Sequence, residues 1–263
     1  MFGRSLRDYR RPLIGWTVGI SAFVAMYLAI YASIKQAPDF YGAAALAKFP
    51  GPLRELMGGL QDLTSGTGYL QTVVYQLLVP AFCVACTTIM ANKAIAQPEE
   101  AGTLELVVTL PIDRKRLVVD RFAALVVGVL IMASVTLLVA FTVERAAGAD
   151  VPFDRLLAGH TGVILLSLFF GCVALAVGAA TGKKNLASSV VGVWAVLSYM
   201  VITIGQNVPA ISWLKWVSPF HYYADGRPLY EGFPVGDYLV LAGATAVLVL
   251  GAVLAFDRRD VGV

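Results

Sequence analysis

Two closely spaced cysteines are the first residues of this chain whose types and spacing could do chemistry. Cys83 and Cys86 form a C-x-x-C pair, a spacing used by redox and metal sites, and Cys172 is the third cysteine of the chain. A zinc site would add a second pair or a nearby histidine, and the sequence supplies neither. All three cysteines fall in apolar stretches, so we favour packing between helices over redox or metal chemistry.

A charged segment between two prolines, residues 97–111, could instead dock a partner. Pro98 suits the first position of a helix, and Glu99 and Glu100 then lie in the first turn, where the helix dipole favours negative charge. Apolar residues recur on one face, which predicts an amphipathic helix that Pro111 ends. The plain interpretation is a helix at the membrane surface, and the functional one is a docking element.

Nucleotide chemistry and enzyme chemistry find little support. The string from Gly178 to Lys184 has one spacer too few for a P-loop and has lysine where serine or threonine must bind magnesium. The two histidines are His160 and His221, and Asp225-Gly226-Arg227 is weakly similar to the start of a lipid head-group transferase motif. The further aspartates of such enzymes are missing, and no Gly-x-Ser-x-Gly elbow occurs. We therefore expect no enzyme activity in this chain itself.

The elements that position these residues are long apolar stretches. The chain has 263 residues, of which 58% are apolar and 14% are charged. In soluble domains about a quarter of the residues are charged. Since a helix needs about 20 apolar residues to cross a membrane, six spans are predicted. Their ranges are 12–34, 69–91, 117–143, 159–181, 186–208 and 238–256. We expect an all-α integral membrane protein in which residues 1–263 form a single transmembrane domain.

The short connections orient the chain. One set of connections, with both chain ends, holds 13 of the 20 Lys and Arg residues, and the other set holds 7. Because cytoplasmic loops are enriched in Lys and Arg, both termini are predicted to be cytoplasmic. Residues 1–11 are basic with apolar residues at helical spacing, which predicts an N-terminal interfacial helix before Pro12 begins the first span.

No ionisable residue is predicted in the middle of a span. Glu144, Arg145 and His160 are expected at the outer ends of spans, and Asp120 and Arg121 near an inner end. Ion-coupled transport needs buried ionisable groups in the membrane, so a transporter of this sequence is expected to take its energy from elsewhere.

The string from Glu99 to Glu105, followed by Leu110-Pro111 and a basic cluster, resembles the inter-span signature of bacterial ATP-binding-cassette type-2 exporter permeases. Three further motifs agree with the resemblance, which covers essentially the whole chain. These motifs are Gly66-x-Gly68-Tyr69-Leu70 before the second span, Ser218-Pro219-Phe220 with Arg227-Pro228-Leu229 in the last outer loop, and Phe256-Asp257-Arg258-Arg259-Asp260 near the end of the chain.

This resemblance implies a permease subunit in the bacterial inner membrane. Such permeases pair with a second permease, identical or paralogous, and each seats a cytoplasmic coupling helix between spans two and three on a separate ATPase that binds ATP and Mg²⁺. The implied substrate is amphipathic or hydrophobic: a drug, an antibiotic, a lipid or a peptide. The alternatives are a membrane anchor or assembly subunit for an ATPase, without transport, and a lipid-modifying membrane enzyme.

Two sets of site residues follow. By the resemblance, the ATPase-contact residues are Glu99, Glu100, Gly102, Thr103, Leu104 and Glu105. Polar residues inside the second and fifth spans either bond one helix to another or line a substrate path, and both interpretations stay open. These residues are Gln71, Gln76, Ser198, Thr203, Gln206 and Asn207.

Overall fold

Six long apolar helices dominate the structure. The computed structural model describes residues 2–50, 63–104, 113–203 and 208–259, and within these ranges no strand occurs. The helices long and apolar enough to cross a membrane are Ser5–Ile34, Gly66–Ala94, Arg114–Ala146, Phe153–Thr181, Lys184–Thr203 and Val235–Arg258. They confirm the all-α membrane fold and the six predicted spans. The predicted end of the fifth span includes residues 204–207, which lie outside the described residues.

Short helices join the long ones. In chain order the elements are α1 (Phe2–Ile34), α2 (Pro38–Tyr41), α3 (Ala43–Leu46), α5 (Gly66–Tyr69), the π-helix η1 (Leu70–Tyr75), α6 (Leu78–Ala94), α7 (Ala96–Glu100), α9 (Arg114–Ala146), α10 (Phe153–Thr181), α11 (Lys184–Thr203), the 3₁₀-helix η3 (Pro209–Val217), α12 (Pro219–Ala224), α13 (Pro228–Glu231) and α14 (Val235–Arg258).

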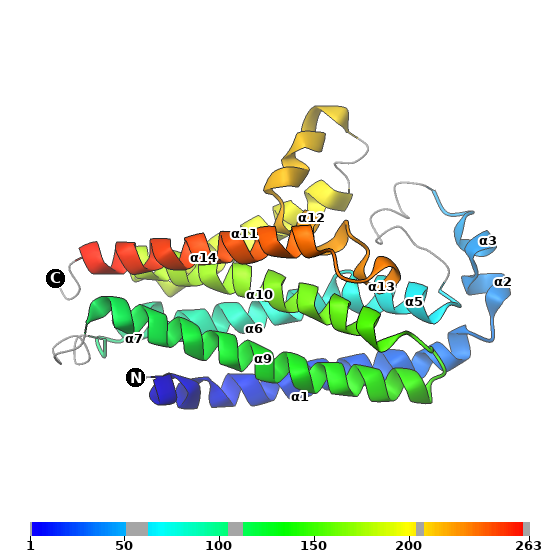
Figure 1. Ribbon diagram of the computed structural model, residues 1–263, viewed down its shortest axis with the longest axis horizontal. Helices are drawn as coiled ribbons and strands as arrows, with labels where there is room; N and C mark the ends of the chain where they lie inside the picture. Colours follow the sequence, from blue (N-terminus) through cyan, green and yellow to red (C-terminus); the bar gives the residue numbers. More distant parts are fainter. Residues whose placement is uncertain (1, 51–62, 105–112, 204–207, 260–263) are drawn as a thin grey trace.

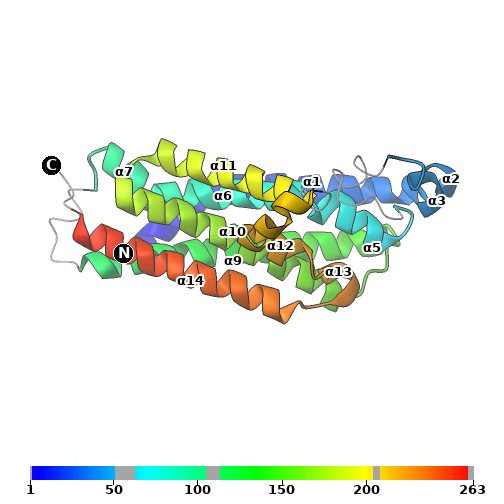
Figure 2. The same cartoon turned by 90° about the horizontal axis from the view of Figure 1, so that it is seen from above.

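The bundle is built around α10. In its most apolar stretch 72% of the residues are buried, against 22% in α1, α11 and α14. It packs against α6, α9, α11 and α14, while α1 packs against α9 and α6 on the other side. Figures 1 and 2 show the long helices running along one axis. Both chain ends and α7 lie at one end, here called the terminal end, and α2, α3 and α5 lie at the other, the distal end.

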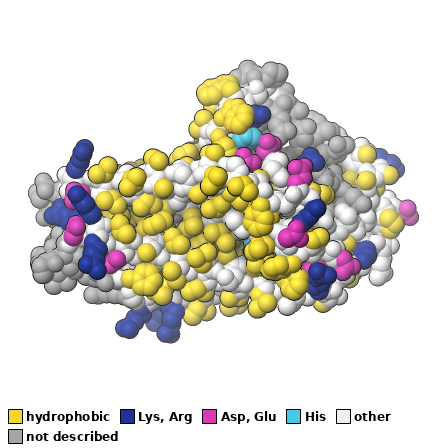
Figure 3. Space-filling model, viewed as in Figure 1, with side chains coloured by type: hydrophobic (Ala, Val, Ile, Leu, Met, Phe, Trp, Pro, Cys, Tyr) yellow, Lys and Arg dark blue, Asp and Glu magenta, His cyan; other side chains and the backbone are white. Residues whose placement is uncertain are grey.

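The surface fits a membrane. On the face shown in Figure 3, hydrophobic side chains cover the middle of the bundle, and charged side chains gather towards its two ends. Large apolar side chains with more than half of their surface exposed occur on α1, α11 and α14, among them Val18, Val193 and Val247. A membrane would cover such side chains, because exposed apolar surface of this extent is unfavourable in water.

The separate N-terminal interfacial helix is not seen, because α1 continues through Pro12. Proline removes one backbone hydrogen bond from a helix interior. The two sides of Pro12 are nevertheless held to the bundle, since Tyr9 and Leu13 are both buried in the core. At about 1.5 Å per residue, the 33 residues of α1 are longer than the roughly 30 Å hydrocarbon core. One continuous helix therefore has the length both for the span and for the basic turns before it.

The second span begins with a tight contact at the distal end. Ser65 caps α5 by accepting a hydrogen bond from the Gly68 N–H (3.1 Å). A Cβ atom at Gly66 would overlap the backbone of Ala149, which lies in the connection between α9 and α10. Two tyrosines fix the same region, because Tyr31 donates to the Thr64 carbonyl (2.8 Å) and Tyr69 to the Tyr27 carbonyl (2.6 Å).

The π-helix η1 leads Tyr75 into a buried polar contact. The Tyr75 hydroxyl hydrogen-bonds Nδ1 of His160 on α10, and the Tyr223 hydroxyl donates to the Tyr75 carbonyl (2.5 Å). Both His160 and Glu144 lie towards the distal ends of their helices, and both are buried: His160 is 5% exposed and Glu144 is fully buried. Glu144 accepts a hydrogen bond from the Val151 N–H (3.2 Å) in the connection between α9 and α10, and it pairs with Arg145 (3.2 Å).

We predict that Gly66→Ala destabilises the protein. The added methyl group would meet backbone atoms of Ala149, which cannot move aside as a flexible side chain would. Overpacking of this kind lowers the free energy of unfolding by about 1–3 kcal/mol. Thermal unfolding of the protein in detergent measures the effect. Gly243→Ala is the matched control: its added methyl group would have nothing within 4 Å, so an equal loss there would contradict the explanation.

Candidate functional site

Residues 93–104 form a corner at the end of α6 that contains α7, and this segment is here called the α7 corner. Three apolar residues anchor it in the core. Ile95, Ala96 and Leu104 are each at most 1% exposed. Pro98 has no N–H to donate to the Ala94 carbonyl one turn earlier, and α6 ends at Ala94. Ala96 then packs against Gly178 of α10, where a larger residue would press on it. The corner is thus fixed against the central helix.

The helix of the α7 corner is shorter than the sequence predicts. It ends at Glu100, and Gly102 adopts a left-handed conformation (φ 67°) that favours glycine. The N–H groups of Thr103 and Leu104 donate back to the Pro98 carbonyl (2.9 and 3.0 Å). Gly102 therefore ends a helix, whereas the predicted amphipathic helix placed it in the middle. Residues 105–112, which hold the rest of that predicted helix, lie outside the described residues.

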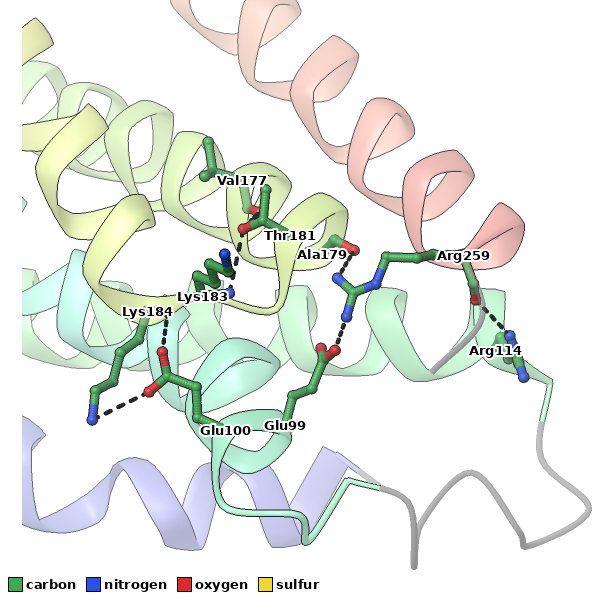
Figure 4. A network of polar contacts seen from close by, with 9 residues as sticks. All are labelled: Glu99, Glu100, Arg114, Val177, Ala179, Thr181, Lys183, Lys184 and Arg259. Atoms are coloured by element: carbon green, nitrogen blue, oxygen red, sulfur yellow. Dashed lines mark hydrogen bonds and ion pairs between the residues drawn. The ribbon is translucent and has the colours of Figure 1, made fainter. Parts of the chain in front are cut away.

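Glu100 caps the start of α11. Its Oε1 accepts a hydrogen bond from the Lys184 backbone N–H (2.9 Å), and its Oε2 lies 3.3 Å from Lys184 Nζ. Lys184 is the first residue of α11. A helix begins with unpaired N–H groups and a positive partial charge, so a carboxylate there satisfies one N–H and stabilises the helix. Glu100 does this from another helix (Figure 4).

Glu99 reaches the end of the chain. Its Oε1 forms an ion pair with Arg259, whose Nη1 donates to the Ala179 carbonyl (3.0 Å) in the last turn of α10. The Arg259 carbonyl in turn accepts a hydrogen bond from Arg114 at the start of α9 (2.9 Å). Partial burial lowers the pKa of Arg259, but an arginine stays charged at neutral pH. Figure 4 shows these contacts from one viewpoint.

Opposite charges therefore sit at the two helix ends that meet beside the α7 corner. The C-terminus of α10 faces the Arg259 guanidinium, and the N-terminus of α11 faces the Glu100 carboxylate, as the helix dipoles require. Gly182 links α10 to α11 in a left-handed conformation (φ 70°), and a Cβ atom there would overlap the Glu99 and Arg259 side chains. The α7 corner, the α10–α11 turn and the end of α14 thus form one connected unit.

The predicted ATPase-contact residues divide into three groups in the structure. Gly102 and Thr103 are exposed, Glu99 and Glu100 are occupied by ion pairs within the chain, and Leu104 faces the core. Glu105 lies outside the described residues. Sequence reasoning missed Arg259 and Lys184 as partners of the glutamates. The signal available was a basic residue at the end of the last span and another in the turn before the fifth.

The polar residues of the second and fifth spans are brought together in part. Gln76 lies beside the Tyr199 hydroxyl, and Thr203 donates to the Tyr199 carbonyl (2.9 Å). Ser198 is buried, and its carbonyl accepts a hydrogen bond from Ser218 (2.9 Å). Gln71 lies a π-turn away on η1, and its Oε1 is buried without a hydrogen-bond partner among the described groups. Gln206 and Asn207 are outside the described residues.

The polar groups of this site join helices to one another and leave part of the α7 corner exposed for a partner. Within residues 2–50, 63–104, 113–203 and 208–259, no three His, Cys, Asp or Glu side chains gather as a metal site would need. Cys83, Cys86 and Cys172 are buried free thiols, and Cys86 Sγ lies 3.8 Å from Met90 Sδ. The exposed part of the α7 corner is therefore the surface of this site at which a partner could act.

A comparison with protein families matches residues 1–257 to the model described as the multidrug efflux system permease Rv1217c, C-terminal domain. A comparison with curated protein sequences gives no significant match.

We predict a coupling of about 1–3 kcal/mol between Glu99 and Arg259 in a double-mutant cycle of Glu99→Gln and Arg259→Gln. Both side chains are more than three-quarters buried, so removal of one leaves the other without its partner. Unfolding in detergent measures the cycle. The matched pair is Lys115–Asp257 at the same end, whose side chains are 55% and 35% exposed, and its coupling should stay below about 1 kcal/mol. Equal coupling in the two pairs would contradict a special role for Glu99.

Proposed function

The chain belongs to the family of this multidrug efflux permease domain, and on that premise we propose that it is the membrane-spanning permease subunit of an ATP-driven exporter. It works with a separate cytoplasmic ATPase, which binds ATP and Mg²⁺, and with a second permease subunit. The substrate is an amphipathic or hydrophobic molecule such as a drug, an antibiotic, a lipid or a peptide.

One observation supports the proposed coupling to an ATPase. The α7 corner presents Gly102 and Thr103 to solvent while the glutamates two and three residues earlier bind the ends of other helices. A force applied to the exposed residues therefore reaches α10, α11 and α14 through charged contacts, and α6 through the chain itself. This connection supports the proposal that an ATPase drives the bundle from this corner.

The proposed route through the membrane uses the second and fifth spans. Gln76 lies beside Tyr199 where the two spans approach each other, and Ser198 and Thr203 lie about one turn or less from Tyr199. A movement of the α7 corner would shift α6 and α11 relative to each other, because α7 directly follows α6 and Glu100 binds the start of α11. We propose that this shift opens a path lined by Gln71, Gln76, Ser198 and Thr203.

The proposed orientation has the terminal end in the cytoplasm. Exposed basic side chains at this end include Lys115, Arg116, Lys183 and Arg258. Cytoplasmic ends of membrane proteins carry such an excess of Lys and Arg. An ATPase in the cytoplasm would then meet the α7 corner directly.

We predict that Thr103→Arg releases the ATPase. Thr103 is exposed and contacts the Pro98 carbonyl of its own corner, so a larger charged side chain should block docking without breaking the ion pairs of Glu99 and Glu100. Affinity purification in mild detergent should recover an ATP-binding protein with the native chain and at least about tenfold less with Thr103→Arg, a loss of about 1.4 kcal/mol of binding free energy.

Gln36→Arg is the matched control for that experiment, since Gln36 is exposed at the distal end and the substitution is of the same kind. It should leave the recovery of the ATPase unchanged. If the ATPase stays bound to Thr103→Arg, the α7 corner is not the docking site. If no ATP-binding protein accompanies the native chain, the proposal of an ATP-driven exporter fails. Uptake of substrate into inverted vesicles then decides whether the chain transports at all.

We predict that Thr103→Cys reacts with a membrane-impermeant maleimide in inverted vesicles and not in intact cells. The chain's own cysteines are buried, so they should contribute little background. Gln36→Cys at the distal end should give the opposite pattern. Labelling of Thr103→Cys from outside intact cells would reverse the proposed orientation and exclude a cytoplasmic ATPase at this corner.

A further inference from the structure

A cavity of about 520 Å³ lies between the first turns of α1 and the α7 corner. Ligand pockets in proteins have volumes of about 300–1,000 Å³, so the cavity can hold a small polar group. One wall is formed by four residues of α1 and the other by α6 and the α7 corner; the lining residues are Arg7, Asp8, Arg10, Arg11, Lys93, Gln97, Pro98, Ala101 and Thr103. It is separate from the ion pairs of Glu99 and Glu100, which face α10, α11 and α14.

The cavity is strongly basic. Arg7, Arg10 and Arg11 line it from one face of α1, Lys93 lines it from α6, and Asp8 is the carboxylate among its lining residues. Within the described part of the chain, no carboxylate lies within ion-pair distance of these four cations. Cations three and four residues apart on a helix repel one another. Their gathering around a cavity is therefore favourable once an anion occupies it.

The position of the cavity along α1 indicates the source of the anion. The basic residues directly precede the apolar part of α1, so they lie where the headgroups of a membrane begin. At helical spacing, Arg7 and Arg11 are followed on the same face by Ile14 and Val18. These two apolar side chains are 54% and 63% exposed. A molecule with an anionic head and an apolar tail matches this order of charge and apolar surface.

We propose that the cavity binds the phosphate headgroup of an anionic phospholipid, with an acyl chain lying along Ile14 and Val18. Arginine and lysine bind phosphate oxygens by charge-assisted hydrogen bonds, and basic pockets between spans on the cytoplasmic side suit anionic headgroups. The lipid would join α1 to the α7 corner. The proposal concerns binding and does not depend on the substrate or direction of transport.

The test measures binding of short-chain phosphatidylglycerol to the intact chain in a neutral detergent, by thermal unfolding and by native mass spectrometry. Phosphatidylcholine of the same chain length and inorganic phosphate are the comparison ligands. Phosphatidylglycerol should raise the unfolding temperature and remain bound, while the other two should not. The triple variant Arg7→Gln/Arg10→Gln/Arg11→Gln should weaken the binding by at least about tenfold. Lys93→Gln, a single change on the opposite wall, should weaken it in the same direction if the triple variant fails to fold.

The matched control is Arg116→Gln/Lys183→Gln/Arg258→Gln, which removes three exposed cations from the same end of the bundle without touching the cavity. It should bind phosphatidylglycerol as the native chain does. Equal losses in the two triple variants would show a general surface attraction and overturn the site. An equal response to inorganic phosphate would overturn the lipid as occupant, and the absence of any response to phosphatidylglycerol would overturn the proposal altogether.

Discussion

The terminal end of the bundle depends on how two helix ends that meet at a sharp turn are neutralised. The last carbonyls of α10 and the first N–H groups of α11 carry partial charges of opposite sign a few residues apart. Arg259 approaches the first and Glu100 the second. Glu99 then balances Arg259. The position of the five-residue helix α7 follows from this arrangement, since so short a helix has little stability of its own.

Close packing around α10 connects this end of the bundle to the neighbouring helices. Lipid gives little driving force for helices to associate, so membrane bundles rely on small residues that bring backbones together. Gly162 lies against Tyr223 and Tyr238, Gly171 against Thr87 and Leu125, and Gly178 against Ala96. The central helix therefore contacts α6, α7, α9, α12 and α14 with little space between them. A displacement of its terminal end would therefore press on these neighbouring helices.

Hydropathy alone predicted the six spans, because the length and continuity of apolar stretches are local properties of the sequence. Hydropathy could not predict the partners of the α7 corner. Glu99 and Arg259 are far apart in the chain, and a periodic pattern carries no information on such pairs. Local rules also misled at Pro12 and Gly102. Pro12 was read as a helix start although packing on both sides keeps α1 continuous, and Gly102 was read as helical although its φ is positive. His160 was placed by its position along a span, which says nothing of the neighbouring helices that bury it.

The π-helix η1 is the place at which the second span can change its length by one residue. A π-turn accommodates one residue more than an α-turn, so deletion of one residue between Leu70 and Tyr75 would turn it into regular α-helix and leave both flanks in phase. The same deletion within α6 would rotate everything beyond it by about 100° and carry a buried face outwards. A change in length of one residue can therefore be taken up at η1 without rotating α6 against the helices that it contacts.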